Sequence, residues 1–259
     1  MLEFVNDDVA LLLPFVVIGF LAQAMDGALG MAFGVIVNSI LVGFMGMPPA
    51  RASTQVHIVK IFTTAASGLS HYYEGNVDFR LFFSLLIPGI LAGIVGAFLL
   101  SYVHGEIIAP IVLVYLLLVG IWLLIRGIFT SPDIRKPKHV ALIGSIGGFL
   151  DAIGGGGWGP VVTSSLMVQG GEPRKVVGTV NSVEFFLTVV ISATFIAHLG
   201  IGDLLGPTLG LLIGGIIAAP FGAIIAKNLK PKIMFILVGV VLSLTSLVAL
   251  YQLVLSTPA

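Results

Sequence analysis

Long apolar runs constrain this chain more than any other feature. Four of them are almost free of polar side chains: Leu81–Tyr102, Ile107–Ile125, Leu204–Ala226 and Ile233–Leu255. Two more, Ala52–His71 and Val176–His198, are similarly long but carry embedded polar groups. An α-helix needs about 20 apolar residues to cross a bilayer, and lipid offers no partner to an open backbone N–H or C=O group. The runs therefore predict membrane-spanning helices.

The composition excludes the soluble classes of protein. Charged residues make up only 9% of the 259, and twelve Lys and Arg balance twelve Asp and Glu. A typical soluble domain has roughly 25%. So few charges cannot cover a water-facing surface, and no basic excess favours nucleic acid. A soluble enzyme, a disordered protein and a nucleic-acid partner are not expected. The lack of cysteine also removes disulfides and thiolate ligands.

Shorter apolar stretches flank two Gly-rich segments. Val9–Ala24 and Met31–Phe44 lie on either side of residues 26–30. In the second half of the chain, His139–Leu150 and Pro160–Val168 flank a similar segment that contains four consecutive glycines. At about 1.5 Å per residue, these stretches reach only part of the way across a bilayer. We expect a pair of short helices in each half, interrupted at a Gly-rich break.

The chain repeats itself in one ungapped register. Asp26 matches Asp151, Gly30 matches Gly155 and Gly34 matches Gly159. The same register pairs Ser39 with Ser164, Pro48 with Pro173, Thr54 with Thr179, Thr63 with Thr188, Ser67 with Ser192 and Asp78 with Asp203. Matched Asp, Pro, Thr and Ser indicate an internal duplication. The predicted units are a first membrane repeat at 1–130, a basic cytoplasmic linker at 131–138 and a second membrane repeat at 139–259.

An odd number of crossings in each half would turn the second half upside down. Each half holds one short pair, which returns to its starting side, and three full crossings. Such inverted repeats are typical of secondary transporters, whose sites lie where broken helices meet. The predicted fold is an all-α polytopic membrane protein of two inverted repeats. Each repeat has a short Gly-broken helix pair plus three transmembrane helices, giving about 8–10 membrane segments.

Basic residues are distributed unevenly among the loops. Lys and Arg gather at residues 126–138, 174–175 and 227–232, whereas the loops near 101–106 and 199–203 have none. Short cytoplasmic loops carry the excess of Lys and Arg in membrane proteins. The basic loops are therefore expected in the cytoplasm and both termini outside.

These motifs together resemble the sulfite exporter TauE/SafE family. An Asp-x-x-x-Gly-x-x-x-Gly stretch begins at Asp26 and again at Asp151, and a Pro-x(5)-Thr segment follows each, at 48–54 and 173–179. The resemblance covers nearly the whole chain, including the duplication and the basic linker. It implies transport of small anions across the bacterial inner membrane: sulfite, organosulfonates or related sulfur-containing or carboxylate anions.

The Gly-rich breaks are the first candidates for binding an anion. Their glycines are Gly30, Gly34, Gly155, Gly156 and Gly157. A helix that starts at such a break presents unpaired N–H groups and a partial positive charge, and glycine lets a ligand approach the backbone. The alternative is structural, because Gly-x-x-x-Gly spacing also serves close helix packing.

Two aspartates accompany the breaks. An ionisable residue inside a membrane is a functional hypothesis by default, but a carboxylate is an odd ligand for an anion. We expect Asp26 and Asp151 to cap backbone N–H groups at the breaks, which would be a structural role. A place near an aqueous mouth and a proton relay are the alternatives.

The third long element of each half carries a polar pair. His57 and Lys60 share one helix face with Thr54 nearby, and would attract an oxyanion and exchange a proton. Alternatively, Lys60 reaches the interface and His57 packs in the core. Asn181 and Glu184, with Thr179, form the second group.

Glu184 could load a proton together with substrate, or pair with Lys60 across the halves. In the repeat register, Asn181 and Glu184 align with two valines and not with His57 and Lys60. We therefore expect an asymmetric site. Smaller polar candidates are Gln23, Asn38, Ser39, Thr163, Ser164 and Thr179, most of them expected to bond within the protein.

The function predicted from these observations is secondary active transport of a small anion by alternating access, with protons as a candidate coupling ion. An anion channel and a non-transporting subunit of a larger complex are the alternatives. No His-Glu-x-x-His, Gly-x-Ser-x-Gly or phosphate-binding-loop motif occurs, so an enzyme, an ATPase, a metal and a cofactor are not expected. The expected partners are the anion, the lipid bilayer, protons and a second copy in a homodimer.

Overall fold

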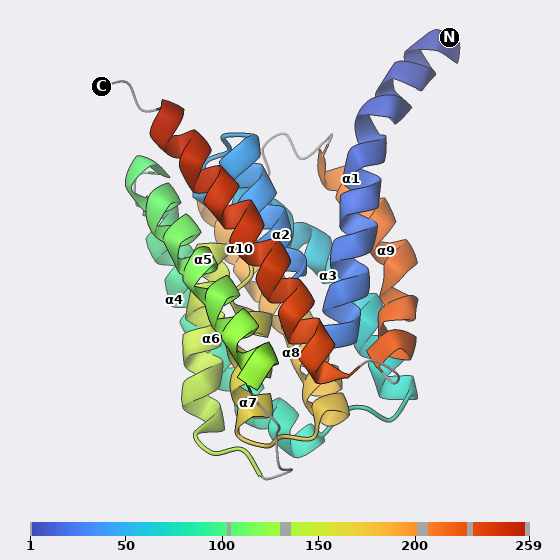
Figure 1. Cartoon of the computed structure of the whole chain (residues 1–259), viewed down its shortest axis with the longest axis vertical. Coiled ribbons are helices and arrows are strands. Elements are labelled where there is room, and N and C mark those ends of the chain that lie inside the picture. The colour runs from blue at the N-terminus through green and yellow to red at the C-terminus, as the bar shows by residue number, and fades with distance from the viewer. Residues whose placement is uncertain (1, 103–104, 130–135, 201–206, 227–229, 257–259) are drawn as a thin grey trace.

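A computed structural model describes residues 2–102, 105–129, 136–200, 207–226 and 230–256 of the chain. In these ranges every regular element is a helix and no strand occurs. The helices form one bundle (Figure 1). This result confirms the all-helical prediction for the part of the chain that is described.

The described helices have the following bounds: α1 Leu2–Leu29, α2 Phe33–Ser39, α3 Pro49–Tyr73, α4 Phe79–Tyr102, α5 Gly105–Phe129, α6 Val140–Gly154, α7 Ser164–Val168, α8 Pro173–Leu199, α9 Pro207–Ala226 and α10 Pro231–Ser256. Two π-helical turns, η1 at Ile40–Phe44 and η2 at Gly159–Thr163, continue α2 and precede α7. The six long apolar runs each fall in one helix, although residues 204–206 lie outside the described ranges.

Helix lengths and surfaces fit a polytopic membrane protein. Among the described residues, Leu12–Leu29, Phe79–Tyr102 and Pro173–Leu199 are long and apolar enough to cross a bilayer. Four shorter apolar helices accompany them: Phe33–Phe44, Leu113–Phe129, Val140–Gly154 and Thr208–Gly222. The bundle exposes large apolar side chains along α4, α5 and α9 and buries charged ones. Such a molecule is inside out relative to a soluble protein.

The first segment differs from the prediction. A short helix over Val9–Ala24 is wrong, because α1 continues unbroken through Asp26 to Leu29. The break comes afterwards, where Gly30 and Ala32 take positive φ angles of 64° and 129°. The Asp26 carboxylate, in the last turn of α1, accepts a hydrogen bond from a backbone N–H beyond the break.

The second short pair agrees with the prediction. Helix α6 ends at Gly154, Gly155 adopts a left-handed φ of 67°, and the chain re-enters a helix at residue 158. Pro160 lies in the first turn of η2, where its missing N–H costs no hydrogen bond. The glycine run therefore forms a break between two short helical segments.

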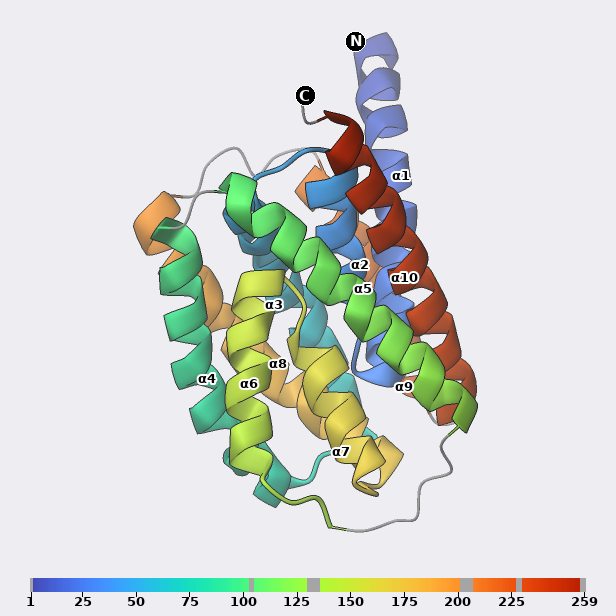
Figure 2. The ribbon, with the colours of Figure 1, turned by 60° about the vertical axis from the view of Figure 1, so that its left-hand side comes forward.

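Helices from the two halves are exchanged in the packing. α1 packs along α9, and α6 packs along α4, while α3 lies against α8 and α5 against α10 (Figures 1 and 2). Glycines allow these approaches: a Cβ added at Gly148 of α6 would collide with the Gly89 backbone of α4. A Cβ at Gly19 of α1 would collide with Leu211 of α9. Neither half therefore buries its own first helix.

The first helix of the chain, α1, and the first helix after the linker, α6, run in opposite directions (Figures 1 and 2). α1 starts at the end of the molecule where α10 finishes, and α6 starts at the other end, where α5 finishes (Figures 1 and 2). α3 and α8 are opposed in the same way. The start of α1 and the end of α10 thus lie at one end of the bundle, and the start of α6 lies at the other (Figures 1 and 2).

Candidate functional site

The two Gly-rich breaks touch each other inside the bundle. A Cβ added at Gly34 would collide with the Gly155 carbonyl, and a Cβ at Gly159 would collide with the Gly30 carbonyl. All four glycines are buried. Only glycine permits this mutual approach of two backbones. In this conformation the glycines pack against each other, which is the structural alternative considered for their spacing.

Matching side chains bond across the contact. The Asn38 amide, from the segment after the first break, donates to the Gly154 carbonyl at 2.7 Å. The Thr163 hydroxyl, from the segment after the second break, donates to the Gly30 carbonyl at 2.8 Å. Asn38 and Thr163 occupy equivalent positions in the repeat register. Each break is therefore held by a side chain from the other half.

Asp26 and Asp151 accept backbone hydrogen bonds seven residues along the chain. The Phe33 N–H donates to Asp26 Oδ1 at 3.2 Å, and the Trp158 N–H donates to Asp151 Oδ1 at 3.1 Å. Both aspartates are buried. One backbone N–H group after each break is thus bonded to a carboxylate of the protein.

A cluster of ionisable groups lies beside the breaks. Lys60 of α3 forms an ion pair with Glu184 of α8, and its Nζ lies 3.7 Å from Asp151 Oδ1. His57 Nε2 lies 3.0 Å from Asp151 Oδ2. All four side chains are at most 2% exposed. Buried charges require such partners, so the four groups form one electrostatic unit that joins α3, α6 and α8.

His57 is bonded at both ring nitrogens. Nδ1 lies 2.7 Å from the Ser53 carbonyl oxygen and 3.3 Å from the Ser53 hydroxyl. That hydroxyl donates to the Ala152 carbonyl at 2.7 Å. Ser53 therefore ties α3 to the last turn of α6 and orients the imidazole toward Asp151.

Other predicted site residues have hydrogen-bond partners outside this cluster. The Thr54 hydroxyl donates to the Ala50 carbonyl of its own helix, at 2.7 Å. The Thr179 hydroxyl accepts from the Asp78 N–H at 2.8 Å. Asn181 accepts from the Ser67 hydroxyl at 3.2 Å. Asn181 thus bridges α8 and α3, and Thr179 joins α8 to the residue before α4, whereas Thr54 bonds only within its own helix.

Several buried polar atoms near the breaks have no hydrogen-bond partner among the described residues. They are both amide atoms of Gln23, Oδ2 of Asp26, Oγ1 of Thr63, Oε2 of Glu184 and the hydroxyl of Tyr115. Sequence reasoning missed Thr63 and Tyr115 as site candidates. Thr63 lies three residues after Lys60 and matches Thr188 in the repeat, a signal that could have marked it. Tyr115, which contacts Gly154, stands in a plain apolar run and gave none.

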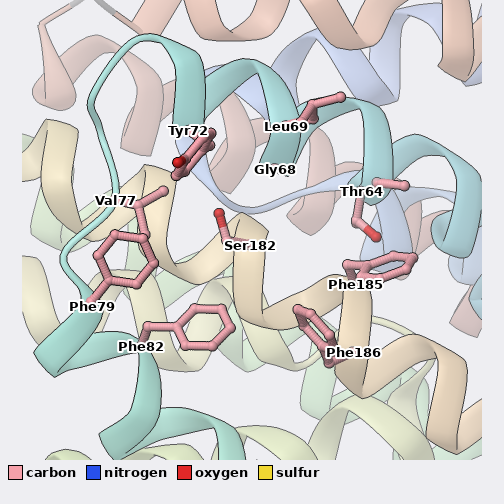
Figure 3. A pocket seen from close by; sticks show the side chains of 11 residues that line it. Thr64, Gly68, Leu69, Tyr72, Val77, Phe79, Phe82, Ser182, Phe185 and Phe186 are labelled. Atoms are coloured by element: carbon pink, nitrogen blue, oxygen red, sulfur yellow. The ribbon is translucent and has the colours of Figure 1, made fainter.

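Two cavities lie outside the charged cluster. One, of about 420 Å³, opens between α3, α4 and α8 and is lined mainly by apolar side chains, among them Tyr72, Phe82 and Phe186 (Figure 3). The hydroxyls of Thr64 and Ser182 in its wall donate to carbonyls of their own helices, so they offer no donor to an anion. The other, of about 640 Å³, is lined by groups that include Asp78, Arg80 and Lys136.

The described residues contain no group of three His, Asp or Glu side chains arranged to hold a metal ion. The side chains of the charged cluster can form ion pairs and exchange protons. Lys60 and His57 supply positive charge, and Asp151 and Glu184 supply negative charge. Asp26 adds a further carboxylate within electrostatic range of Lys60.

Comparison of the sequence with known proteins identifies a family. Residues 15–249 match the family described as sulfite exporter TauE/SafE. The chain is 44% identical over 237 residues to the "probable membrane transporter protein YtnM" of Bacillus subtilis (strain 168), covering 88% of this chain and 79% of that protein. No solved structure matches it. The family and this relative support a membrane transporter. The chain belongs to the sulfite exporter TauE/SafE family.

Proposed function

We propose that this protein is a secondary active transporter that moves small oxyanions across the bacterial inner membrane by alternating access. Sulfite, organosulfonates and related sulfur-containing or carboxylate anions are the substrate class. The observation that carries the proposal is Lys60, a cation buried in the middle of a membrane helix and surrounded by groups from both halves. An ionisable group at that depth is costly and marks a transport pathway.

Substrate binding at Lys60 would exchange one anion for another. Without substrate, Lys60 is neutralised by Glu184 and Asp151. An incoming oxyanion takes the place of one carboxylate, which then stands uncompensated in a low-dielectric interior. Leaving one member of a buried pair without its partner costs about 3–5 kcal/mol, so the displaced carboxylate takes up a proton instead. This exchange favours movement of a proton with the anion.

Unpartnered polar groups can complete the oxyanion site. The Gln23 amide on α1 and the Thr63 hydroxyl on α3 are buried donors without a partner among the described residues. A Cβ at Gly215 of α9 would touch the Thr63 methyl group, and α1 packs along α9 here. Buried polar groups are normally satisfied, and a bound oxyanion offers several acceptors.

Alternating access is supported by the relation between the halves, which we propose to be inverted repeats at 1–130 and 139–259 joined by the linker at 131–138. The exchanged packing of α1 and α6, the opposed helix directions and the paired bonds of Asn38 and Thr163 all support this relation. Inverted repeats let one arrangement of helices open to either side of the membrane.

The basic end of the bundle is proposed to face the cytoplasm, with both termini outside. Since the chain has no cysteine, single cysteines can report sidedness directly. In cells, Lys136→Cys should be shielded from a membrane-impermeant maleimide, and Tyr102→Cys should react. Labelling of both from the same side would contradict this topology.

Reconstituted protein tests the proposed function. Thermal unfolding with sulfite, thiosulfate, methanesulfonate and short carboxylates should identify binders, because a ligand of the folded state raises its stability. The best binder should then accumulate in proteoliposomes against its own gradient when protons are supplied. Flux that only equalises concentrations and never saturates would indicate a channel, and no binding or flux would favour a non-transporting subunit.

A further inference from the structure

We propose that His57 and Asp151 together hold the proton that travels with the substrate, an inference that rests on the proposed transport function. Each residue comes from a different half of the chain, His57 from α3 and Asp151 from α6. They meet at 3.0 Å, fully buried and beside Lys60. The hydrogen-bond partners that surround the imidazole determine where its protons lie.

The Nδ1 atom of His57 carries a hydrogen. It lies 2.7 Å from the Ser53 carbonyl oxygen, which can only accept a hydrogen bond. The Ser53 hydroxyl at 3.3 Å cannot donate to Nδ1, because its single hydrogen is already given to the Ala152 carbonyl. Nδ1 is therefore the donor in this contact.

A second proton must lie between the imidazole and the carboxylate. With its hydrogen on Nδ1, a neutral imidazole would present a lone pair at Nε2 to the carboxylate oxygen of Asp151. Two acceptors at hydrogen-bond distance repel each other in a buried site. The pair therefore holds one proton more than neutral His57 and ionised Asp151 would hold, whether that proton resides on Nε2 or on Oδ2.

Other titratable groups face this pair from the neighbouring elements. Lys60 of α3 lies 3.7 Å from Asp151 Oδ1, and Glu184 of α8 is paired with Lys60. Tyr115 of α5 and Asp26 of α1 interact electrostatically with Asp151. No titratable residue occurs in η2, and those of α4, Arg80 and Tyr102, lie near the helix ends.

The proton and the substrate then favour each other. When the pair is protonated, Asp151 competes weakly for Lys60, so Lys60 can bind the oxyanion. When the proton leaves, the Asp151 carboxylate loses its partner His57 and turns to Lys60, which displaces the anion. The same carboxylate accepts the Trp158 N–H through Oδ1, so the change reaches the Gly-rich break directly.

Asp26 offers an internal control for this inference. It accepts the Phe33 N–H as Asp151 accepts that of Trp158. The position equivalent to His57 in the second half is Ser182, whose hydroxyl bonds to Gly178 in its own helix. Asp26 therefore shares the backbone role of Asp151 but has no imidazole partner.

Proteoliposomes can separate proton coupling from substrate binding. With the membrane potential clamped at zero and one proton moved per anion, one pH unit of gradient should drive about tenfold accumulation of labelled sulfite. Exchange of labelled for unlabelled sulfite at equal pH requires binding but no net proton movement. We expect the ratio of gradient-driven accumulation to exchange to fall by about tenfold in His57→Gln and in Asp151→Asn, whatever exchange rate each variant retains.

Controls and a second measurement complete the test. Lys232→Gln, an exposed cation of α10, should behave as wild type, and Asp26→Asn should keep the wild-type dependence on the pH gradient whatever its rate. At a pH high enough to remove this proton from the substrate-free pair, proton uptake when sulfite binds in detergent, read with a pH indicator, should occur in wild type and be lost in both pair variants. Wild-type accumulation or proton uptake in those variants would overturn the inference. A wild type that exchanges no sulfite would instead contradict the proposed function.

Discussion

The break at Asp26 and the break at Asp151 share a backbone design and differ in what surrounds them. In each, one carboxylate oxygen accepts the N–H seven residues ahead. The second oxygen of Asp151 meets His57 at 3.0 Å, whereas the second oxygen of Asp26 has no partner among the described residues. One break is therefore built into an ion-pair network, and the other is not.

This difference originates on the neighbouring helices. In the register of the predicted repeat, Ser182 stands where the first half has His57, and Phe185 stands where it has Lys60. The backbone contacts of the two breaks match, but only one helix of the matched pair supplies cations. A common scaffold can provide the movement in a transporter while one side of it provides the chemistry.

The largest effect should come from removing the only cation of the cluster that is always charged. Lys60→Gln leaves Glu184 without its ion-pair partner and removes the Lys60 charge beside Asp151, a loss of about 3–5 kcal/mol. Sulfite uptake in proteoliposomes should fall by roughly 100-fold or more, which is the equivalent of about 3 kcal/mol. Lys232→Gln should keep the wild-type rate. Equal rates of the two variants would remove Lys60 from the site.

A double variant separates stability from transport at the same place. Lys60→Gln combined with Glu184→Gln removes both charges of the ion pair, so the folded state no longer holds that uncompensated acid. Thermal unfolding should recover part of the stability that Lys60→Gln loses, while uptake stays absent. Recovery of uptake would show that the cation is dispensable.

The two aspartates should differ in what they contribute to stability. Asp151→Asn removes a charge paired with His57 and close to Lys60, and should lower the free energy of unfolding by about 3–5 kcal/mol. Asp26→Asn keeps an oxygen for the Phe33 N–H and should cost about 1 kcal/mol or less. Unfolding in detergent measures both. Equal losses of unfolding free energy would mean that the two aspartates contribute equally to the stability of the folded state.

The glycine contacts should instead behave alike in the two breaks. Gly34→Ala and Gly159→Ala each force a Cβ into a backbone carbonyl of the other break, and each should cost about 1–3 kcal/mol. Gly154→Ala is the control, because its Cβ would meet only the Tyr115 ring at 3.3 Å, and a side chain can move. If one of these two alanine variants kept its stability and the other unfolded, the two glycine contacts would not be equivalent.

A small effect is expected at Thr163. Thr163→Val preserves shape but removes the hydroxyl that bonds to the Gly30 carbonyl, at a cost of about 1–2 kcal/mol. Thr188→Val, which removes a hydroxyl bonded within its own helix, should cost less. If both variants have the same free energy of unfolding, the hydrogen bond across the breaks contributes no more stability than a bond within one helix.

Sequence reasoning reached the helices and the breaks because their signals are local. Apolar runs and glycines reported six long helices and both interruptions. It failed at α1, where Asp26 and Gly27 looked like the start of a break. The helix continues through them to Leu29, and the Asp26 carboxylate bonds forward to Phe33, a contact that no hydropathy pattern reveals.

The site was only partly visible for a related reason. Pairing of Lys60 with Glu184 was among the alternatives, since two opposite charges in apolar sequence have few other partners. The contact of His57 with Asp151 depends on α6 lying against α3 across the halves, and chain order does not report that packing. Thr54 was over-interpreted, because a threonine in a helix commonly bonds to the carbonyl four residues back.

The exchanged packing of α1 and α9 also sets an order of biogenesis. α1 is synthesised first, yet the surface that receives its glycines belongs to α9, near the end of the chain: Gly19 lies against Leu211 and Gly27 against Gly222. α6, in contrast, finds α4 already made. Membrane helices insert first and associate afterwards. Within the bilayer, the small-residue face of α1 therefore stays exposed to lipid until α9 has been synthesised and inserted.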